Sequence, residues 1–215
     1  MRKISEMITI GITGGIGSGK SYFCKRLEAA GIPVFYADAE SKKLVSSNED
    51  VKNAIVALLG NEAYKNDGSL DRKFVADKIF SNTKLRNSLN GIIHPAVHEQ
   101  FKKWTEELDV SGEYPVAAME AAILYESEFD KFVDKVVVIT APSKIRTERV
   151  MERDHCEEED VKRRMKAQWP EKRKVELADF VINNSPTDDL NQQLFELLKK
   201  LYALSEKRNN AENKE

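Results

Sequence analysis

The sequence predicts an α/β fold in which a parallel β-sheet is flanked by helices. Short apolar runs alternate with longer stretches of helical spacing along the 215 residues. Several runs are apolar throughout, which is typical of strands that are buried on both faces of a parallel sheet. This alternation predicts a doubly wound sheet with right-handed crossovers. The five predicted strands are Met7–Thr13, Pro33–Ala37, Tyr114–Glu120, Lys135–Ala141 and Asp179–Asn183.

Helical segments follow three of these strands. Lys20–Ala30 comes after the first strand and ends at a glycine and a proline, which are helix stop signals. Ser143–Glu152 opens on a serine that can cap a helix. Leu190–Leu204 has leucines at helical spacing that can cover a sheet. The charged residues 205–215 contain almost no apolar side chain, so we expect a disordered tail.

About 75 residues separate the second and third predicted strands, far more than an ordinary loop. Ala39–Leu59, Asp71–Phe80 and His94–Leu108 have helical character, so we expect a helical insertion over residues 39–113. A polar helical segment, Glu157–Glu176, precedes the last strand and would belong to a lid over residues 154–176. The core of this single domain, which spans residues 7–204, would comprise residues 7–38, 114–153 and 177–204.

The composition excludes several classes of protein. Lys and Arg total 34 and Asp and Glu total 36, a net charge of −2 that argues against a general nucleic-acid partner. No apolar stretch approaches the about 20 residues of a membrane span, and the N-terminus lacks signal-peptide features. The two cysteines, Cys24 and Cys156, lie far apart in the sequence and form no CxxC motif. We therefore expect a reducing compartment. We expect a cytoplasmic protein without a membrane partner, either a monomer or a weak homo-oligomer.

The strongest chemical signal is GGIGSGKS at Gly14–Ser21, which fits G-x-x-x-x-G-K-[ST] between a predicted strand and a helix. Glycines let the main chain curl so that its N–H groups approach phosphate oxygens, and the helix adds its positive N-terminal end. Lys20 would reach the β- and γ-phosphates, and the Ser21 hydroxyl would bind Mg²⁺. The alternative, a glycine-rich turn that binds nothing, is disfavoured by this context. The predicted nucleotide-binding residues are Gly15, Ile16, Gly17, Ser18, Gly19, Lys20, Ser21 and Tyr22.

Two acids stand at the ends of predicted strands, where ligands bind in open α/β sheets. Asp38 could accept a proton from an attacking hydroxyl or orient that hydroxyl. It could equally be a helix N-cap, because Asp caps well and helical sequence follows. Glu120 could support Mg²⁺ from a distance, and a solvent contact at the strand end is the alternative.

Arginines recur on one predicted helical face, because Arg146, Arg149 and Arg153 are three and seven residues apart. The segment from Lys144 to Lys174 contains 11 basic and 8 acidic residues. Such a segment suits a mobile lid that carries arginines to a γ-phosphate. A solvated helix face with interleaved ion pairs is the alternative, and it is the better interpretation for any single arginine.

With these residues in place, the chain resembles the dephospho-coenzyme A kinases, enzymes related to the nucleoside monophosphate kinases. The likeness runs from about Ile8 to Leu201. The string GITGGIGSGKS at Gly11–Ser21 is more particular than the generic loop, and further short segments follow in the family's order. These are Ala37-Asp38, Asp67–Arg72, Ile92–Pro95, Ile123–Glu126, Arg164 with Gln168, Lys174, Ala178-Asp179 and Val181–Asn184.

The resemblance implies a P-loop kinase fold with a five-stranded parallel sheet, a helical substrate-binding insertion and a short lid. It implies transfer of the γ-phosphoryl group of ATP, with Mg²⁺, to the ribose 3′-hydroxyl of dephospho-CoA, giving CoA and ADP. Asp38 then becomes the catalytic base or hydroxyl-orienting group, and Lys20 and Arg153 join it as catalytic residues. The resemblance adds Arg72, His94 and Glu120 on the acceptor side and Arg149 and Arg164 on the nucleotide side.

Four positions depart from the family pattern. Tyr22 stands where threonine is usual, Tyr36 replaces the first aspartate of Asp-Ala-Asp, and Ala121-Ala122 replaces a small residue followed by proline. None of them touches the phosphate chemistry. Two rivals remain: another small-molecule P-loop kinase, and a GTP-dependent switch protein. Asp109 with Gly112 superficially matches a switch element, but the sequence has no Asn-Lys-x-Asp guanine motif.

Overall fold

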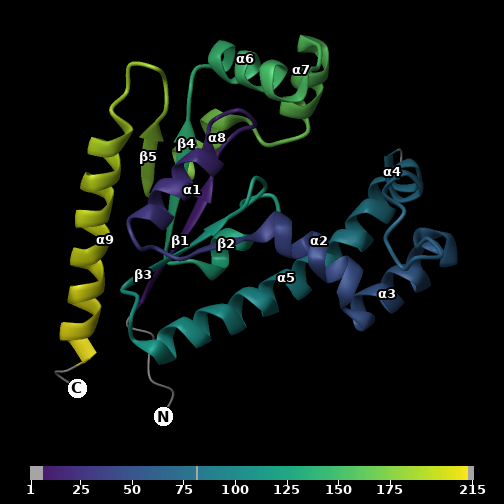
Figure 1. The fold of residues 1–215 in the computed structure, drawn as a ribbon, viewed down its shortest axis with the longest axis horizontal. Coiled ribbons are helices and arrows are strands. Elements are labelled where there is room, and N and C mark those ends of the chain that lie inside the picture. Colours follow the sequence, from purple (N-terminus) through teal and green to yellow (C-terminus); the bar gives the residue numbers. More distant parts are fainter. Residues whose placement is uncertain (1–6, 81, 213–215) are drawn as a thin grey trace. The chain divides into compact units, whose positions relative to one another are not determined.

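A parallel sheet of five strands runs through the first of two structural units (Figure 1). The computed structural model describes residues 7–80 and 82–212. The first unit holds the described residues up to Tyr36 and those from Thr105 onward, and the second is Ala37–Trp104. The strands are β1 (Ile8–Thr13), β2 (Val34–Tyr36), β3 (Val116–Glu120), β4 (Lys135–Thr140) and β5 (Phe180–Asn183).

The strands lie in the order β2-β3-β1-β4-β5, and each neighbouring pair is parallel. β1 is the central strand, with Ile12 in register with Glu120 of β3 and Val137 of β4. Ile10 and Ile12 expose no surface, because helices and loops cover the strand on both sides. The apolar runs therefore predicted all five strands and their parallel arrangement correctly, and the strand that precedes the glycine-rich loop lies in the middle of the sheet.

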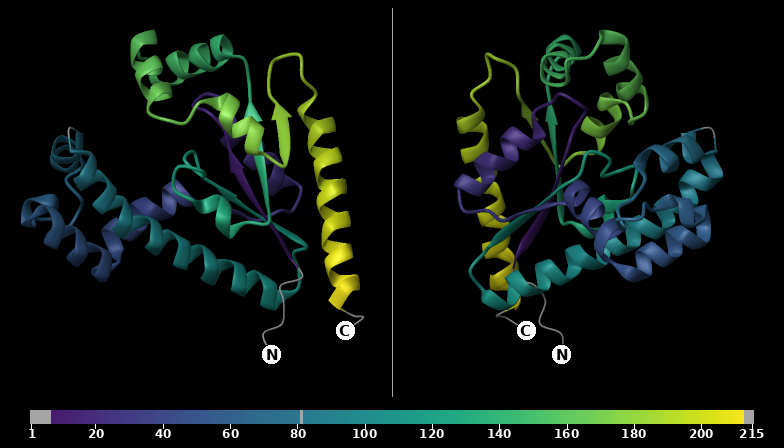
Figure 2. Two further views of the ribbon diagram at one scale, coloured as in Figure 1. Left: turned by 180° about the vertical axis from the view of Figure 1, so that it is seen from behind. Right: turned by 45° about the vertical axis from the view of Figure 1, so that its right-hand side comes forward.

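Two helices cover one face of this sheet. They are α1 (Lys20–Ala29), which follows β1, and α9 (Leu190–Glu212), which lies beside β5 in both views of Figure 2. Phe23 of α1 and Leu194 of α9 join alternate strand side chains in one buried cluster. The unit also contains α6 (Ser143–Asp154), α7 (Glu158–Lys166) and α8 (Glu171–Leu177).

The second unit is helical, as expected for the insertion between the second and third strands. Its core gathers side chains from each of its helices around Ile55, which exposes no surface. The helices are α2 (Ala37–Ser47), α3 (Glu49–Leu59), α4 (Arg72–Phe80) and α5 (Thr83–Ser111), the last of which continues into the first unit.

Three helices differ from the sequence expectation in their bounds. The helix expected over Ala39–Leu59 is two helices, because the Asn48 side chain accepts a hydrogen bond from the Val51 N–H (3.0 Å) and starts α3. The helix expected over His94–Leu108 begins at Thr83 and contains Pro95 in its interior. The polar segment expected over 157–176 is likewise two helices, α7 and α8.

The C-terminal segment also differs from expectation, since residues 205–212 continue α9 instead of forming a disordered tail. Ser205 is buried, and the Arg208 guanidinium donates to the Met7 carbonyl (3.0 Å) and pairs with Asp134. These contacts hold the last turns of the helix against the sheet. Residues 213–215 lie outside the described residues. Among the described residues, none of the helices has both the length and the apolar character that crossing a membrane requires.

Candidate active site

The loop between β1 and α1 curls tightly against its neighbours. Gly14 and Gly17 have positive φ angles of 150° and 79°, which glycine adopts without strain. A Cβ on Gly14 would lie 2.1 Å from the Ile139 carbonyl oxygen, and one on Gly17 would lie 2.3 Å from that of Arg146. Glycine is therefore required where the loop meets the end of β4 and the start of α6.

The beginning of α1 offers donors to an anion. Gly19 stands at the N-cap position and has no side chain that could cap the N–H groups of the first turn. Lys20 Nζ folds back onto the loop and donates to the carbonyl oxygens of Gly14 (3.0 Å) and Gly15 (3.4 Å). A phosphate group in the loop would replace these neutral acceptors with charged ones, which bind an ammonium group more strongly.

Two serine hydroxyls fit a bound triphosphate and its magnesium ion. The Ser18 hydroxyl oxygen is buried within the loop and has no hydrogen-bond partner among the described residues. Ser21, in the first turn of α1, is exposed. Mg²⁺ on a nucleotide takes one or two oxygen ligands from protein, with phosphate oxygens and water completing its shell. The Ser21 hydroxyl is a ligand of that kind.

Arg146 and Arg149 of α6 pack against the loop. The Arg146 guanidinium lies so close to Gly15 that a Cβ there would approach Nη1 to 2.0 Å, and it pairs with Glu171 at 2.9 Å. Arg146 is only 8% exposed, so a solvated helix face is the wrong interpretation for this residue. Arg146 Nε and Arg149 Nη1 are buried without hydrogen-bond partners among the described residues. These donors are available to a ligand of the loop.

Arg153 and Arg164, the other two arginines expected near the nucleotide, meet at one carboxylate. Arg153 binds both oxygens of Asp154 (2.7 and 2.9 Å), and Arg164 Nη1 lies 2.6 Å from Oδ2. Hydrogen bonds from Arg153 and then Arg164 hold the pKa of the Asp154 carboxyl well below its usual range. The structure thus groups these arginines in two pairs. Arg146 and Arg149 of α6 pack against the loop, and Arg153 of α6 and Arg164 of α7 share Asp154.

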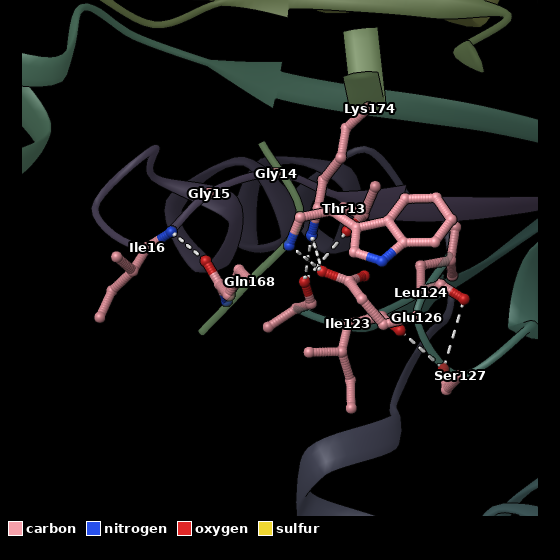
Figure 3. A network of polar contacts seen from close by, with 12 residues as sticks. Thr13, Gly14, Gly15, Ile16, Ile123, Leu124, Glu126, Ser127, Gln168 and Lys174 are labelled. Atoms are coloured by element: carbon pink, nitrogen blue, oxygen red, sulfur yellow. Dashed lines mark hydrogen bonds and ion pairs between the residues drawn. The ribbon is translucent and has the colours of Figure 1, made fainter. Parts of the chain in front are cut away.

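A buried polar network lies beneath the loop and was not predicted from the sequence (Figure 3). Lys174 of α8 exposes no surface, and its Nζ lies 2.8 Å from Glu126 Oε1 and 3.0 Å from the Ala122 carbonyl oxygen. The same Glu126 oxygen accepts the Trp169 N–H at 2.8 Å. Both residues lie in short segments that the chain shares with the family it resembles, and this was the only sign in the sequence that they matter. The sequence did not indicate that the two side chains contact each other.

Comparison with known proteins identifies the family. Residues 8–189 match the family model of dephospho-CoA kinase. The chain belongs to this family. It is 40% identical to the dephospho-CoA kinase of Bacteroides fragilis (strain YCH46), over 91% of this chain and 93% of that protein. It is 38% identical to the dephospho-CoA kinase of Geobacillus kaustophilus, over 92% and 98% of the two chains.

Solved structures agree with the observed fold. The crystal structure of TT1252 from Thermus thermophilus superposes with a TM-score of 0.77 at 30% identity, over 92% of this chain and 97% of that one. The dephospho-CoA kinase from Campylobacter jejuni has a TM-score of 0.66 at 24% identity, over 91% and 97% of the chains, which supports the fold alone. The P-loop kinase fold predicted from the sequence is confirmed.

Glu120, one of the acceptor-side residues expected for a dephospho-CoA kinase, ends β3 in the first unit. It is 7% exposed and lies in register with Tyr36 of β2, so the strand-end solvent contact considered for it is wrong. Asp38 is exposed in the first turn of α2, which starts one residue earlier at Ala37, so Asp38 is not an N-cap. Arg72 is exposed at the first position of α4. His94 lies in α5, where burial lowers the pKa of its imidazole.

Proposed function

We propose that this chain transfers the γ-phosphoryl group of ATP to the ribose 3′-hydroxyl of dephospho-CoA and releases CoA and ADP. Membership in the dephospho-CoA kinase family supplies the reaction. The observation that carries the proposal is the curled loop Gly14–Gly19, with Lys20 and the start of α1 directly behind it. This arrangement concentrates N–H donors and an ammonium group where the phosphates must bind.

Charge stabilisation is the main contribution of the loop to the reaction. In phosphoryl transfer, negative charge spreads over the oxygens of the transferred group, and preorganised donors lower the barrier without having to reorganise. Lys20 and the loop N–H groups that make no hydrogen bond among the described residues are such donors. The Ile16 and Ser18 N–H groups already donate, to Gln168 Oε1 and to the Gly15 carbonyl oxygen. Mg²⁺, when bound, would neutralise charge on the β- and γ-phosphates, and Ser21 would hold it through its hydroxyl oxygen.

Asp38 would act on the acceptor. We assign it the alignment of the 3′-hydroxyl for in-line attack and the uptake of the hydroxyl proton. Arg72, a permanent cation, would bind a phosphate of dephospho-CoA. His94 has a lowered pKa, so at neutral pH it would bind as the uncharged imidazole. Glu120 would complete the acceptor side from the end of β3.

The arginines would close over the nucleotide. Arg149 Nη1, beside the loop, has no hydrogen-bond partner within residues 7–80 and 82–212. Arg153 and Arg164 would turn from Asp154 to phosphate oxygens when the lid closes, because phosphate carries more charge than a carboxylate. Closure would also exclude water and so suppress ATP hydrolysis.

The setting of the reaction follows the same proposal. We place the protein in the cytoplasm, acting as a monomer or a weak homo-oligomer without nucleic-acid or membrane partners.

The test is a comparison of acceptors. ADP release is measured with ATP and dephospho-CoA, and then with AMP, CMP and a pantothenate-type acceptor. We expect turnover with dephospho-CoA alone and a product that NMR shows to carry phosphate on the 3′-oxygen. Faster turnover of a nucleotide acceptor would replace the proposal with the rival kinase. Tight GTP binding without any acceptor phosphorylation would instead indicate a switch protein.

A further inference from the structure

Gln168 reaches from the lid to the phosphate-binding loop. Its side-chain oxygen Oε1 accepts a hydrogen bond from the backbone N–H of Ile16 at 3.0 Å (Figure 3). The residue lies in the short connection between α7 and α8. An N–H group can be met only by the oxygen of a carboxamide, so this bond fixes which end of the Gln168 amide faces the loop.

The neighbouring Trp169 and residues of α8 make contacts that fix this connection in place. Trp169 stacks on Tyr125, with ring centroids 6.1 Å apart and planes 2° apart, and the Arg173 guanidinium lies 3.4 Å from its ring centroid on one face. Glu171 pairs with Arg146, and Lys174 pairs with Glu126 in the buried network. Gln168 therefore stands on a rigid support. A side chain whose own position is fixed in this way loses little entropy when it binds a ligand.

The other end of the amide is unused. Gln168 Nε2, which carries two N–H donors, makes no hydrogen bond within the described part of the chain. Because Oε1 is held by Ile16, these donors stay next to the loop that binds the phosphates under the proposed function. They complement Lys20 and Arg149, since they add donors without adding charge.

We propose that Gln168 is a further catalytic residue, whose Nε2 donates a hydrogen bond to an oxygen of the γ-phosphoryl group during transfer. This inference rests on the proposed function. It adds no step to the reaction: the bond between the γ-phosphorus and the β,γ-bridging oxygen breaks, and a bond from the 3′-oxygen to phosphorus forms. The Nε2 donor stabilises the charge that shifts onto the transferred oxygens. The Ile16 N–H orients that donor.

Two substitutions test the assignment through their pH dependence. Gln168→Leu removes both polar groups, and we expect kcat to fall about 100-fold with the KM for ATP changed less than threefold. Gln168→Glu keeps an oxygen for Ile16 but presents a carboxylate to the phosphates, so kcat should fall further at pH 8. Nearby phosphate raises the pKa of that carboxyl, and protonation restores an O–H donor. The ratio of Q168E to wild-type kcat should therefore rise at least fivefold between pH 8 and pH 5.5, whereas the Q168L ratio stays constant.

Gln193→Glu is the matched control. Gln193 of α9 also accepts a backbone N–H, from Asn183 at 2.8 Å, but its Nε2 is occupied by the Asn183 carbonyl oxygen. Q193E should leave kcat within twofold of wild type at every pH. Thermal unfolding of each variant shows whether it is folded, and Q168L decides the question if Q168E unfolds.

Three results would overturn the assignment. The first is kcat within threefold of wild type for Q168L. The second is a pH-independent Q168E ratio. The third is tighter ATP binding by Q168L at unchanged kcat, which would make Gln168 a placeholder that nucleotide displaces. A wild-type enzyme that does not phosphorylate dephospho-CoA would instead refute the proposed function, so the two failures are distinguishable.

Discussion

Lys174 Nζ lies 2.8 Å from Glu126 Oε1, and the lysine exposes no surface. The pair joins α8, at the end of the lid, to the segment that leaves β3. Burial of a charged side chain is costly unless a partner and hydrogen bonds compensate. Here the Ala122 carbonyl oxygen accepts from Lys174, and the Trp169 N–H donates to Glu126 Oε1. A single substitution at either residue of this ion pair should therefore weaken the attachment of the lid to the core.

Lys174→Met should therefore destabilise the protein by about 3–5 kcal/mol, because it leaves the Glu126 carboxylate buried without its cation. The free energy of unfolding in urea measures this. Lys172→Met on the same helix is the control, since Lys172 is 89% exposed and 3.9 Å from Glu176, and it should cost less than about 1 kcal/mol. Equal losses of unfolding free energy in the two variants would show that the buried ion pair contributes no more to stability than an exposed one.

Asp134 should make stability depend on pH. Burial raises the pKa of its carboxyl, but hydrogen bonds from Arg208 and Thr9 outweigh burial and leave the pKa below its ordinary value. The stabilisation is then fully present above the unfolded pKa of about 4 and is lost as pH falls through the lower folded pKa. The difference in Tm between wild type and Asp134→Asn should be constant from pH 5 to 8 and shrink below pH 4. A difference that grows on acidification would contradict the pairing.

Asp38→Asn should lower kcat about 100-fold or more while ATP still binds, because the amide cannot take up the proton of the attacking hydroxyl. Steady-state kinetics with dephospho-CoA, together with calorimetric titration of a non-hydrolysable ATP analogue, separate the two effects. Glu40→Gln provides the control on the same helix, where Glu40 forms an ion pair with the exposed Lys43. Turnover of D38N near the wild-type value would refute the assignment of the base.

Local patterns in the sequence were sufficient to predict the sheet and its loop. Buried parallel strands are apolar on both faces, and a phosphate-binding loop needs glycines before Lys20. Both features therefore depend on residues that are adjacent in the sequence. The burial of Arg146 and Lys174 could not be predicted in this way. Each looks like a surface residue until its partner, Glu171 or Glu126, is known, and for Lys174 that partner lies in a distant segment.

The end of α9 shows the same limit. Composition alone predicts disorder for a stretch with few apolar side chains. The helix persists to Glu212 because Arg208 finds Asp134 and the Met7 carbonyl, two acceptors that only the folded sheet brings together. Tertiary contacts outweighed local composition at this position.

The central claim is that the loop after β1 grips the triphosphate through its N–H groups and Lys20. Phosphorylation of dephospho-CoA by wild type and by Lys20→Met, at equal concentrations of folded protein, tests it most directly. We expect wild type to yield CoA and the variant to retain less than about 1% of that rate at an unchanged Tm. A folded Lys20→Met variant with the wild-type rate would contradict the account.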